Sequence, residues 1–437
     1  MMTKHSNILT RLMFILFLIA LTAPLVRFRF NHLFKEKELK GAVTRAERPA
    51  FNFSGWFNED YQQKMETYLN QNFGFRNSLV RLHNQLSFWL FNKTNARDVI
   101  IGNENYLYEL NYIRAYYGQD FIGDSLITER VHRLKTVQDT LNANGKLLVV
   151  VFAPGKGQFY PEYIPDHLKS EFSRTNYQAW KDAGEKAGLE ILDFNAWFLQ
   201  MKNNSEFPLY PKTGIHWSQY GVDLVIDSLI GFIENRTGLD LPDYIITERF
   251  LSTDYQEPDT DLEDGMNLIF PINDEPLAYS KFTINAEGKT KPRLMVISDS
   301  FYWPLFNKGI SSSIFSEGEF WYYNQVIYNS YSDVSVPVSS VDHRKAIFSK
   351  DVVILIVTDA NLPEFPWDFD NLAYTAISTD YEILQAEREA RIRGYSEAIL
   401  NSPEWSDDVR KKAAKNNITF EEQLRLDAIY MLENEGN

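Results

Sequence analysis

KPRLMVISDSFYWPLF, residues 291–306, places an apolar run directly before an acidic residue, a serine and several aromatic residues. The run RLMVIS (293–298) shows no polar alternation, which is typical of a strand that is buried on both faces. Ser300 follows two residues after the end of this run. Functional side chains of α/β proteins gather at the carboxyl ends of such strands. The stretch therefore predicts a parallel sheet and a candidate functional serine at its edge.

Three further apolar runs have the same character and alternate with helical patterns. They are KLLVVVFAP (146–154), LEILDF (189–194) and DVVILIVTD (351–359). Between these runs, apolar or charged residues recur at helical spacing, as around 131–141, 175–187 and 222–233. Continuous apolar strands that alternate with helices favour a parallel sheet covered on both faces. The sequence thus predicts the α/β class, with a parallel sheet flanked by helices.

The segments outside this alternating region have other patterns. Residues 51–120 combine aromatic residues at helical spacing with VIIGNENYLYEL, which predicts a short hairpin turning at Gly102 and Asn103. Residues 240–290 break the alternation and are predicted to form an insertion. Three helical stretches from about residue 380 predict a C-terminal appendage. The expected domains are an anchor at 1–30, an α/β domain with a helical N-terminal region at 31–370, and a helical appendage at 380–437.

The N-terminus carries LMFILFLIALTAPLV (12–26), an uninterrupted apolar or small run behind a mildly basic start. Such a run is typical of an export signal or an uncleaved signal anchor, and a buried core helix is the alternative. No clear A-x-A cleavage site follows, so we expect the segment to stay as a membrane anchor. The rest of the chain is then expected outside the cytoplasm, on the periplasmic side of the inner membrane.

Composition excludes several classes of function. The chain has 437 residues, a net charge of -15 and no basic stripe beyond the N-terminus, which argues against a nucleic-acid partner. It has no Cys, which removes disulfides, thiolate chemistry and Cys-type zinc sites. The acidic run DTDLEDG (259–265) lacks the terminal Glu of a calcium loop, so we interpret it as a solvated loop. We expect no metal and no cofactor.

A serine at a strand-to-helix corner needs a base to remove its proton before it can attack. Among seven His, His216 is the distinctive one, because it lies in GIHW at the expected start of a helix. On spacing alone the pairing of Ser300 with His216 is a weak signal, and a single His is more often structural. Both interpretations remain open at this level.

Four motifs in order resemble a known family, the SGNH-hydrolase-like domain of the alginate O-acetylation proteins AlgX and AlgJ and the related DHHW group. The resemblance covers roughly residues 50–365. The matching stretches are Gly102–Tyr108 for G-x-x-x-(W/Y)-L-(F/Y), Pro154–Lys156 with Tyr160-Pro161 for P-x-K and Y-P, Lys212–Ser218 for K-T-D-x-H-W-(S/T), and Ser298–Phe301 for G-D-S-F.

The resemblance implies a flavodoxin-like sheet and a Ser-His-Asp triad, in which Ser300 is the nucleophile and His216 the general base. It also implies O-acetyl transfer to an envelope or secreted polysaccharide, with a membrane-bound O-acyltransferase as the partner that supplies acetyl groups. Hydrolysis of acetyl esters is the variant in which water is the acceptor. A different hypothesis is a catalytically impaired member that binds polysaccharide or serves as a scaffold in an acetylation or export complex.

Two positions depart from the family motifs. Gly214 stands where the family has the triad Asp, and Ser298 stands where it has Gly. Loss of the Asp is serious, because in serine proteases neutralising the triad Asp lowers turnover by about 10⁴. Asp223, a backbone carbonyl or a Tyr could orient the imidazole instead, and a Ser-His dyad could also operate without a carboxylate. Ser298 is expected to narrow the site at most.

The remaining candidates are residues expected near the substrate. Lys156 in APGKG fails the phosphate-loop pattern and is predicted to be structural or substrate-facing. Trp217 is expected to wedge the start of the helix. The clusters FYW (301–303) and FWYY (320–323) either stack on sugars or belong to the core. The candidate substrate-binding residues are Lys156, Tyr160, Trp217 and Asp299.

Overall fold

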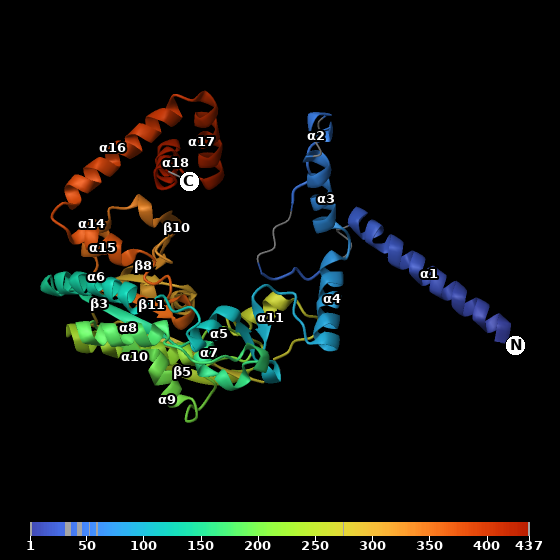
Figure 1. Cartoon of the computed structure of the whole chain (residues 1–437), viewed down its shortest axis with the longest axis horizontal. Helices are drawn as coiled ribbons and strands as arrows, with labels where there is room; N and C mark the ends of the chain where they lie inside the picture. Colours follow the sequence, from blue (N-terminus) through green and yellow to red (C-terminus); the bar gives the residue numbers. More distant parts are fainter. Residues whose placement is uncertain are drawn as a thin grey trace. The chain divides into compact units, whose positions relative to one another are not determined.

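The computed structural model describes residues 2–30, 36–41, 46–51, 53–57, 60–273 and 275–435. The chain divides into two compact units, whose elements are labelled in Figure 1. The first unit comprises residues 1–110, 212–215 and 257–275, and the second comprises 111–211, 216–256 and 276–437. Each unit is therefore assembled from segments that are distant in the sequence.

A seven-stranded sheet forms the centre of the second unit, in the order β10-β9-β8-β7-β11-β3-β4. Neighbouring strands from β8 to β4 run parallel, whereas β9 and β10 continue the sheet as an antiparallel edge. The strands are β3 (Leu147–Ala153), β4 (Ile191–Asp193), β7 (Arg293–Ser298), β8 (Ser316–Tyr322), β9 (Val326–Asn329), β10 (Ser332–Pro337) and β11 (Val352–Thr358). The predicted parallel α/β sheet is confirmed.

The central strands are apolar on both faces because both faces are covered. Every residue of β3 and β11 is buried. Alternate residues of β3, β7 and β11 pack in one apolar cluster with helices of the same unit. These helices are α6 (Asp124–Ala143), α8 (Asn176–Ala187), α14 (His343–Ser349) and α15 (Phe369–Ile377). The other alternate residues are also buried, which is the reason the strand pattern is continuous rather than alternating.

The strands β8, β9 and β10 were not predicted. Their sequences mix acidic, polar and aromatic residues, because strands near an open edge are only half covered. The insertion predicted at 240–290 is present in the second unit as a separate two-stranded antiparallel sheet of β5 (Asp243–Ser252) and β6 (Leu277–Asn285). Residues 257–275 between these strands belong to the first unit and include α11 (Asp261–Met266).

Three helices end the chain, as the sequence predicts. They are α16 (Tyr381–Leu400), α17 (Pro403–Asn416) and α18 (Phe420–Glu433). Ser402 caps α17, and Thr419 with Glu422 forms the predicted capping box of α18. The three helices share a small apolar core of their own, and Figure 1 shows α17 and α18 folded beside the end of α16.

The first unit contains the predicted hairpin and, among its described residues, α11 and four helices from the N-terminal part of the chain. These four are α1 (Met2–Arg29), α2 (Phe53–Phe57), α3 (Asp60–Asn72) and α4 (Arg76–Phe91). The hairpin strands β1 (Val99–Ile101) and β2 (Leu107–Glu109) pair antiparallel around a short 3₁₀ turn. Within α1, residues 10–29 are long and apolar enough to cross a membrane, with a mean hydropathy of 1.9. This helix is consistent with the predicted signal anchor.

Candidate active site

Ser300 begins a 3₁₀ turn, η5 (Ser300–Tyr302), immediately beyond the carboxyl end of β7. The next two residues, Phe301 and Tyr302, are fully buried and fix this turn against the core, while Ser300 itself is half-buried. Buried anchors on one side leave the hydroxyl at the edge of the sheet, where a substrate could reach it. The predicted position of the serine at a strand-to-helix corner is confirmed.

His216 lies within hydrogen-bond distance of the serine. Its Nε2 is 2.9 Å from Ser300 Oγ, although the two residues are 84 positions apart. The imidazole also packs on the ring of Phe301, with centroids 4.7 Å apart. A nitrogen at this distance from a hydroxyl can accept its proton during an attack. The structure therefore brings together the two residues that the sequence proposed as a pair.

His216 lies shortly before α10 (Gln219–Thr237), and the two residues between them are well fixed. Ser218 is the N-cap: its Oγ accepts from the Gly221 amide at 3.1 Å and donates to the Pro208 carbonyl at 2.7 Å. Trp217 is fully buried, and its ring contacts Phe301 and Phe198. This burial is consistent with the predicted wedge role of Trp217 and does not fit the other expected role, in substrate binding.

Asp299 supports the serine turn rather than the histidine. Its Oδ1 accepts from the Phe301 amide at 3.0 Å, and its Oδ2 accepts from the Thr358 amide, the Thr358 hydroxyl and the Asn361 side chain at 2.9–3.0 Å. These four donors satisfy the oxygen atoms of a carboxyl group that is fully buried. Asp299 thus ties the serine turn to the end of β11, and the expected role in substrate contact does not fit its burial.

Gly214 cannot carry the carboxylate of the family motif. A Cβ atom at this position would lie 2.6 Å from the carbonyl oxygen of Asp259 and 2.8 Å from that of Pro258. The backbone of the insertion therefore fills the space that an Asp side chain would need. Within the first unit, main-chain atoms of Pro258 and Asp259 occupy the place where the carboxylate would lie.

The acidic run at 259–265 is not a solvated loop, which corrects the sequence interpretation. Asp259 is completely buried and Glu263 nearly so. Asp261 Oδ1 accepts from the Ile215 amide at 2.8 Å, and the Glu263 amide donates to the Thr213 carbonyl at 3.2 Å. These two residues brace the segment that directly precedes His216 in the sequence. In the sequence, the repeated acidic residues of DTDLEDG were a signal for this role, but their burial depends on tertiary packing.

Asp223, one of the suggested substitutes for the triad Asp, has other partners. Its Oδ1 forms an ion pair with Lys308 at 3.0 Å and accepts from the Tyr244 hydroxyl at 2.7 Å. Ser298, at the position of the family glycine, is fully buried. It therefore does not narrow the site, contrary to the expectation.

Of the remaining predicted substrate residues, Lys156 is fully buried at the start of α7 (Lys156–Phe159). The structural alternative for Lys156 therefore fits its burial, and the substrate-facing one does not. Tyr160 is half-buried, and the ammonium of Lys202 lies 5.0 Å from its ring centroid. In the two aromatic clusters, Phe301, Tyr302, Phe320 and Trp321 belong to the core, while Trp303, Tyr322 and Tyr323 are partly exposed.

Asp359 is a residue near the serine turn that sequence reasoning missed. It follows β11, and its carboxylate packs where a side chain at Gly155 would be, 1.9 Å from the position of that Cβ. Burial raises the pKa of Asp359 from 3.8 to about 7, and the nearby Asp120 and Asp299 carboxylates contribute to the rise. Only glycine at position 155 leaves room for this carboxylate. Within the part of the chain that the structure describes, no cluster of His and acidic residues could hold a metal ion.

Comparison with known families and proteins agrees with the order of motifs. Residues 99–258 match the family model for the SGNH hydrolase-like domain of the acetyltransferase AlgX. A probable alginate O-acetylase AlgJ from Pseudomonas syringae pv. tomato is 24% identical over 200 residues, which is 46% of this chain and 49% of the relative. Its counterpart from Pseudomonas putida is 22% identical over 227 residues, which is 51% of this chain and 57% of the relative. The chain spans about half the length of the curated relatives it matches.

Among solved structures, the O-acetyltransferase domain of Pseudomonas putida AlgJ is similar to this chain, with 16% identity and a TM-score of 0.41 over 64% of this chain and 99% of that domain. The family match spans the hairpin, β3, β4, α10 and the segment that carries His216. The family model and the AlgJ relatives thus agree with the predicted resemblance to AlgX and AlgJ over this part of the chain.

Proposed function

We propose that the protein is a serine-dependent O-acetyltransferase acting on a polysaccharide, a proposal supported by the match of residues 99–258 to the family model for the SGNH hydrolase-like domain of the acetyltransferase AlgX. The observation that carries the proposal is the 2.9 Å distance between Ser300 Oγ and His216 Nε2 at the carboxyl edge of the sheet. This distance satisfies the geometric requirement for general-base activation of a hydroxyl.

The proposed reaction has two halves. Ser300 Oγ attacks the carbonyl carbon of an acetyl ester, His216 takes the hydroxyl proton, and the donor oxygen leaves with that proton, so that an acetyl-serine remains. A sugar hydroxyl then gives its proton to His216 and attacks the acetyl-serine, which regenerates Ser300. Water in place of the sugar would make the same site an esterase. The Ser300 amide is the proposed oxyanion donor, because it belongs to the nucleophile's own turn.

The cellular setting is part of the same proposal. The AlgJ relatives are named as alginate O-acetylases, which supports a polysaccharide as the acceptor. The apolar helix within α1 supports a membrane-anchored, extracytoplasmic protein. A membrane-bound O-acyltransferase is then the proposed partner that delivers acetyl groups.

The test is acetate release from an activated acetyl ester by the full-length protein. We expect activity in the wild type, and a loss of about 10³-fold or more in both Ser300→Ala and His216→Ala. The double variant should lose no more than either single variant, because the two residues act as a unit. Exposed Ser312→Ala serves as the matched control. Wild-type activity that survives Ser300→Ala would contradict the proposed nucleophile.

Gly214 favours the second candidate, a member of an acetylation complex that binds polysaccharide without efficient catalysis. In that case the wild type would release no acetate but would bind the glycan, and the variants would show the same two properties. Equal retention of the glycan by the wild type, Ser300→Ala and His216→Ala, without acetate release, would favour this second candidate.

A further inference from the structure

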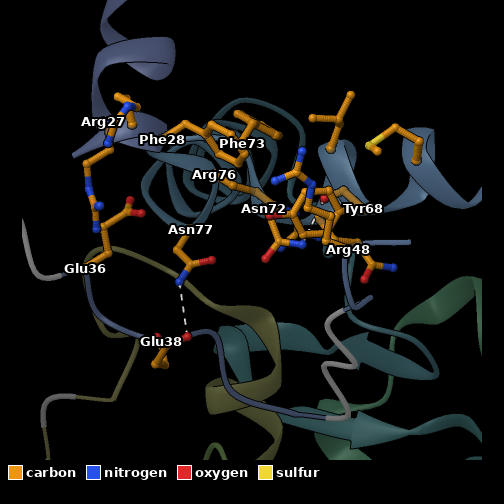
Figure 2. A pocket seen from close by; sticks show the side chains of 15 residues that line it. Arg27, Phe28, Glu36, Glu38, Arg48, Tyr68, Asn72, Phe73, Arg76 and Asn77 are labelled. Carbon is orange, nitrogen blue, oxygen red and sulfur yellow. Dashed lines mark hydrogen bonds between the residues drawn. The ribbon is translucent and has the colours of Figure 1, made fainter. Parts of the chain in front are cut away.

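The first unit contains a pocket of about 740 Å³ that is rich in arginine. Figure 2 shows Arg27, Arg48 and Arg76 among the side chains that surround it. Its charged lining residues are Arg27, Arg29, Arg48, Arg76, Glu36 and Glu38. Four guanidinium groups in a protein with a net charge of -15 form a local exception to the acidic character of the chain.

The pocket lies at the end of the candidate membrane helix. The turn between α3 and α4 packs tightly on the last turns of α1, where a Cβ at Gly74 would be 2.2 Å from the Pro24 carbonyl and 2.6 Å from Arg27 Cβ. The ring of Tyr68 also packs against the ring of Phe28, with ring centroids 6.4 Å apart. Since α1 spans the bilayer in the proposed arrangement, these contacts place the pocket at the level of the lipid headgroups.

The two glutamates of the lining are engaged by the first turn of α4. Glu36 accepts from the amide and the hydroxyl of Ser78 at 3.1 and 2.6 Å. Glu38 accepts from the Asn77 side chain at 3.4 Å, and Figure 2 shows these two residues facing each other. Over the described ranges of the chain, no salt bridge joins Arg48 or Arg76 to a carboxylate, so an anion in the pocket has cationic groups to meet.

The pocket is amphiphilic rather than simply cationic. Leu69 and Phe73 line it with exposed fractions of 47% and 39%, and Phe28 is 38% exposed on the adjoining turn of α1. Apolar side chains left in contact with solvent at the end of a membrane helix suit glycerol and acyl groups. Guanidinium groups bind phosphate through paired hydrogen bonds. The combination fits a molecule with a phosphate at one end and hydrocarbon at the other.

We propose that this pocket binds the headgroup of an anionic phospholipid, with the phosphate held by Arg48 and Arg76 and the glycerol and proximal acyl carbons against Leu69 and Phe73. The inference rests on the proposed retention of α1 as an anchor and does not depend on the acetyl-transfer chemistry. Its role would be to fix the first unit against the membrane surface.

The test is native mass spectrometry of the full-length protein in detergent with short-chain phosphatidylglycerol, phosphatidylcholine, or inorganic phosphate. We expect phosphatidylglycerol to bind at least about tenfold more tightly than phosphatidylcholine. Arg48→Gln with Arg76→Gln should remove this preference. Arg97→Gln, a side chain that is 95% exposed in the same unit and outside the pocket, is the matched control and should retain it.

Each other result would overturn the inference. Equal binding of the two lipids, or a preference that survives the double variant, would exclude the arginine pocket as the lipid site. Inorganic phosphate that binds as tightly as phosphatidylglycerol would identify a soluble-anion site instead. The intact mass also shows whether residues 1–30 are retained, and their removal would take Arg27 and Arg29 out of the pocket. Acetate release in the same variants separates this failure from a failure of the proposed catalysis.

Discussion

The turn that carries Ser300 and the segment that leads into His216 are supported in different ways. Asp299 accepts four hydrogen bonds and joins the serine turn to the end of a neighbouring strand of the central sheet. The residues before His216 are instead hydrogen-bonded to Asp261 and Glu263 in the acidic run of an insertion. The candidate nucleophile is therefore held by strands of the α/β sheet, whereas the segment before the candidate base is held by residues of the insertion.

This contrast explains how the chain can lack the Asp of the family motif. A carboxylate at position 214 has no space, because the backbone at Pro258 and Asp259 fills it. The insertion has thus replaced a side chain with packed main chain, and it contributes buried acidic groups of its own. The serine side of the site shows no comparable replacement, since Asp299 and Ser300 stand as the family motif has them.

The largest effect is expected from restoring the family residue. Gly214→Asp should lower acetate release by about a hundredfold or more and destabilise the protein by about 2–3 kcal/mol, because the new Cβ would overlap backbone atoms that cannot move cheaply. Kinetics and thermal unfolding measure the two effects. Gly231→Asp, at an exposed helix position with open space, is the control. A gain of activity in Gly214→Asp would show that the segment before His216 accepts a side chain easily, and would contradict the proposed difference between the two regions.

A smaller effect is expected at the serine turn. Asp299→Asn should reduce kcat by about tenfold and stability by about 2 kcal/mol, because an amide turns a donor towards groups that are themselves donors. KM should change little if the turn positions the nucleophile without touching substrate. Thr358→Val removes one of the four donors and should cause a fraction of the loss. Equal losses in the two variants would mean that the carboxylate charge is unimportant.

The smallest effect on activity, but a distinct effect on stability, is expected from Asp359. Its pKa is about 7 in the folded protein, against an ordinary value of 3.8, so the folded state binds an extra proton between these two pH values. Stability should therefore fall as the pH rises from about 4 to 7 and then level off. Asp359→Asn should remove this fall and raise stability at pH 8 by roughly 4 kcal/mol.

Denaturant unfolding at pH 5 and pH 8 checks the Asp359 prediction. Exposed Asp227→Asn should behave as the wild type. If Asp359→Asn keeps the pH dependence of the wild type, another buried group causes the fall in stability. Protonation of Asp359 would then contribute less to the stability of the region around the serine turn than its raised pKa indicates.

Much of the fold could be predicted because it rests on local patterns. RLMVIS and DVVILIVTD are continuous apolar runs, and only a strand covered on both faces needs such a pattern. The caps at Ser402 and Thr419 were likewise readable, since they depend on residues three positions apart. The edge strands β8–β10 were not predicted, because half-covered strands carry a mixed pattern that other structures share.

The sequence by itself determined the sheet, the terminal helices, the family motifs and the identities of Ser300 and His216 as candidates. Only the tertiary structure decided that the reacting atoms of these two residues lie 2.9 Å apart, that Asp299 faces the end of β11, and that acids of DTDLEDG are buried. The physical reason is that strand and helix patterns record local burial, whereas the partner of a side chain depends on segments tens of residues away. The arginine pocket is likewise a feature that only the tertiary structure decides, because its charges come from α1, α4 and the chain between them.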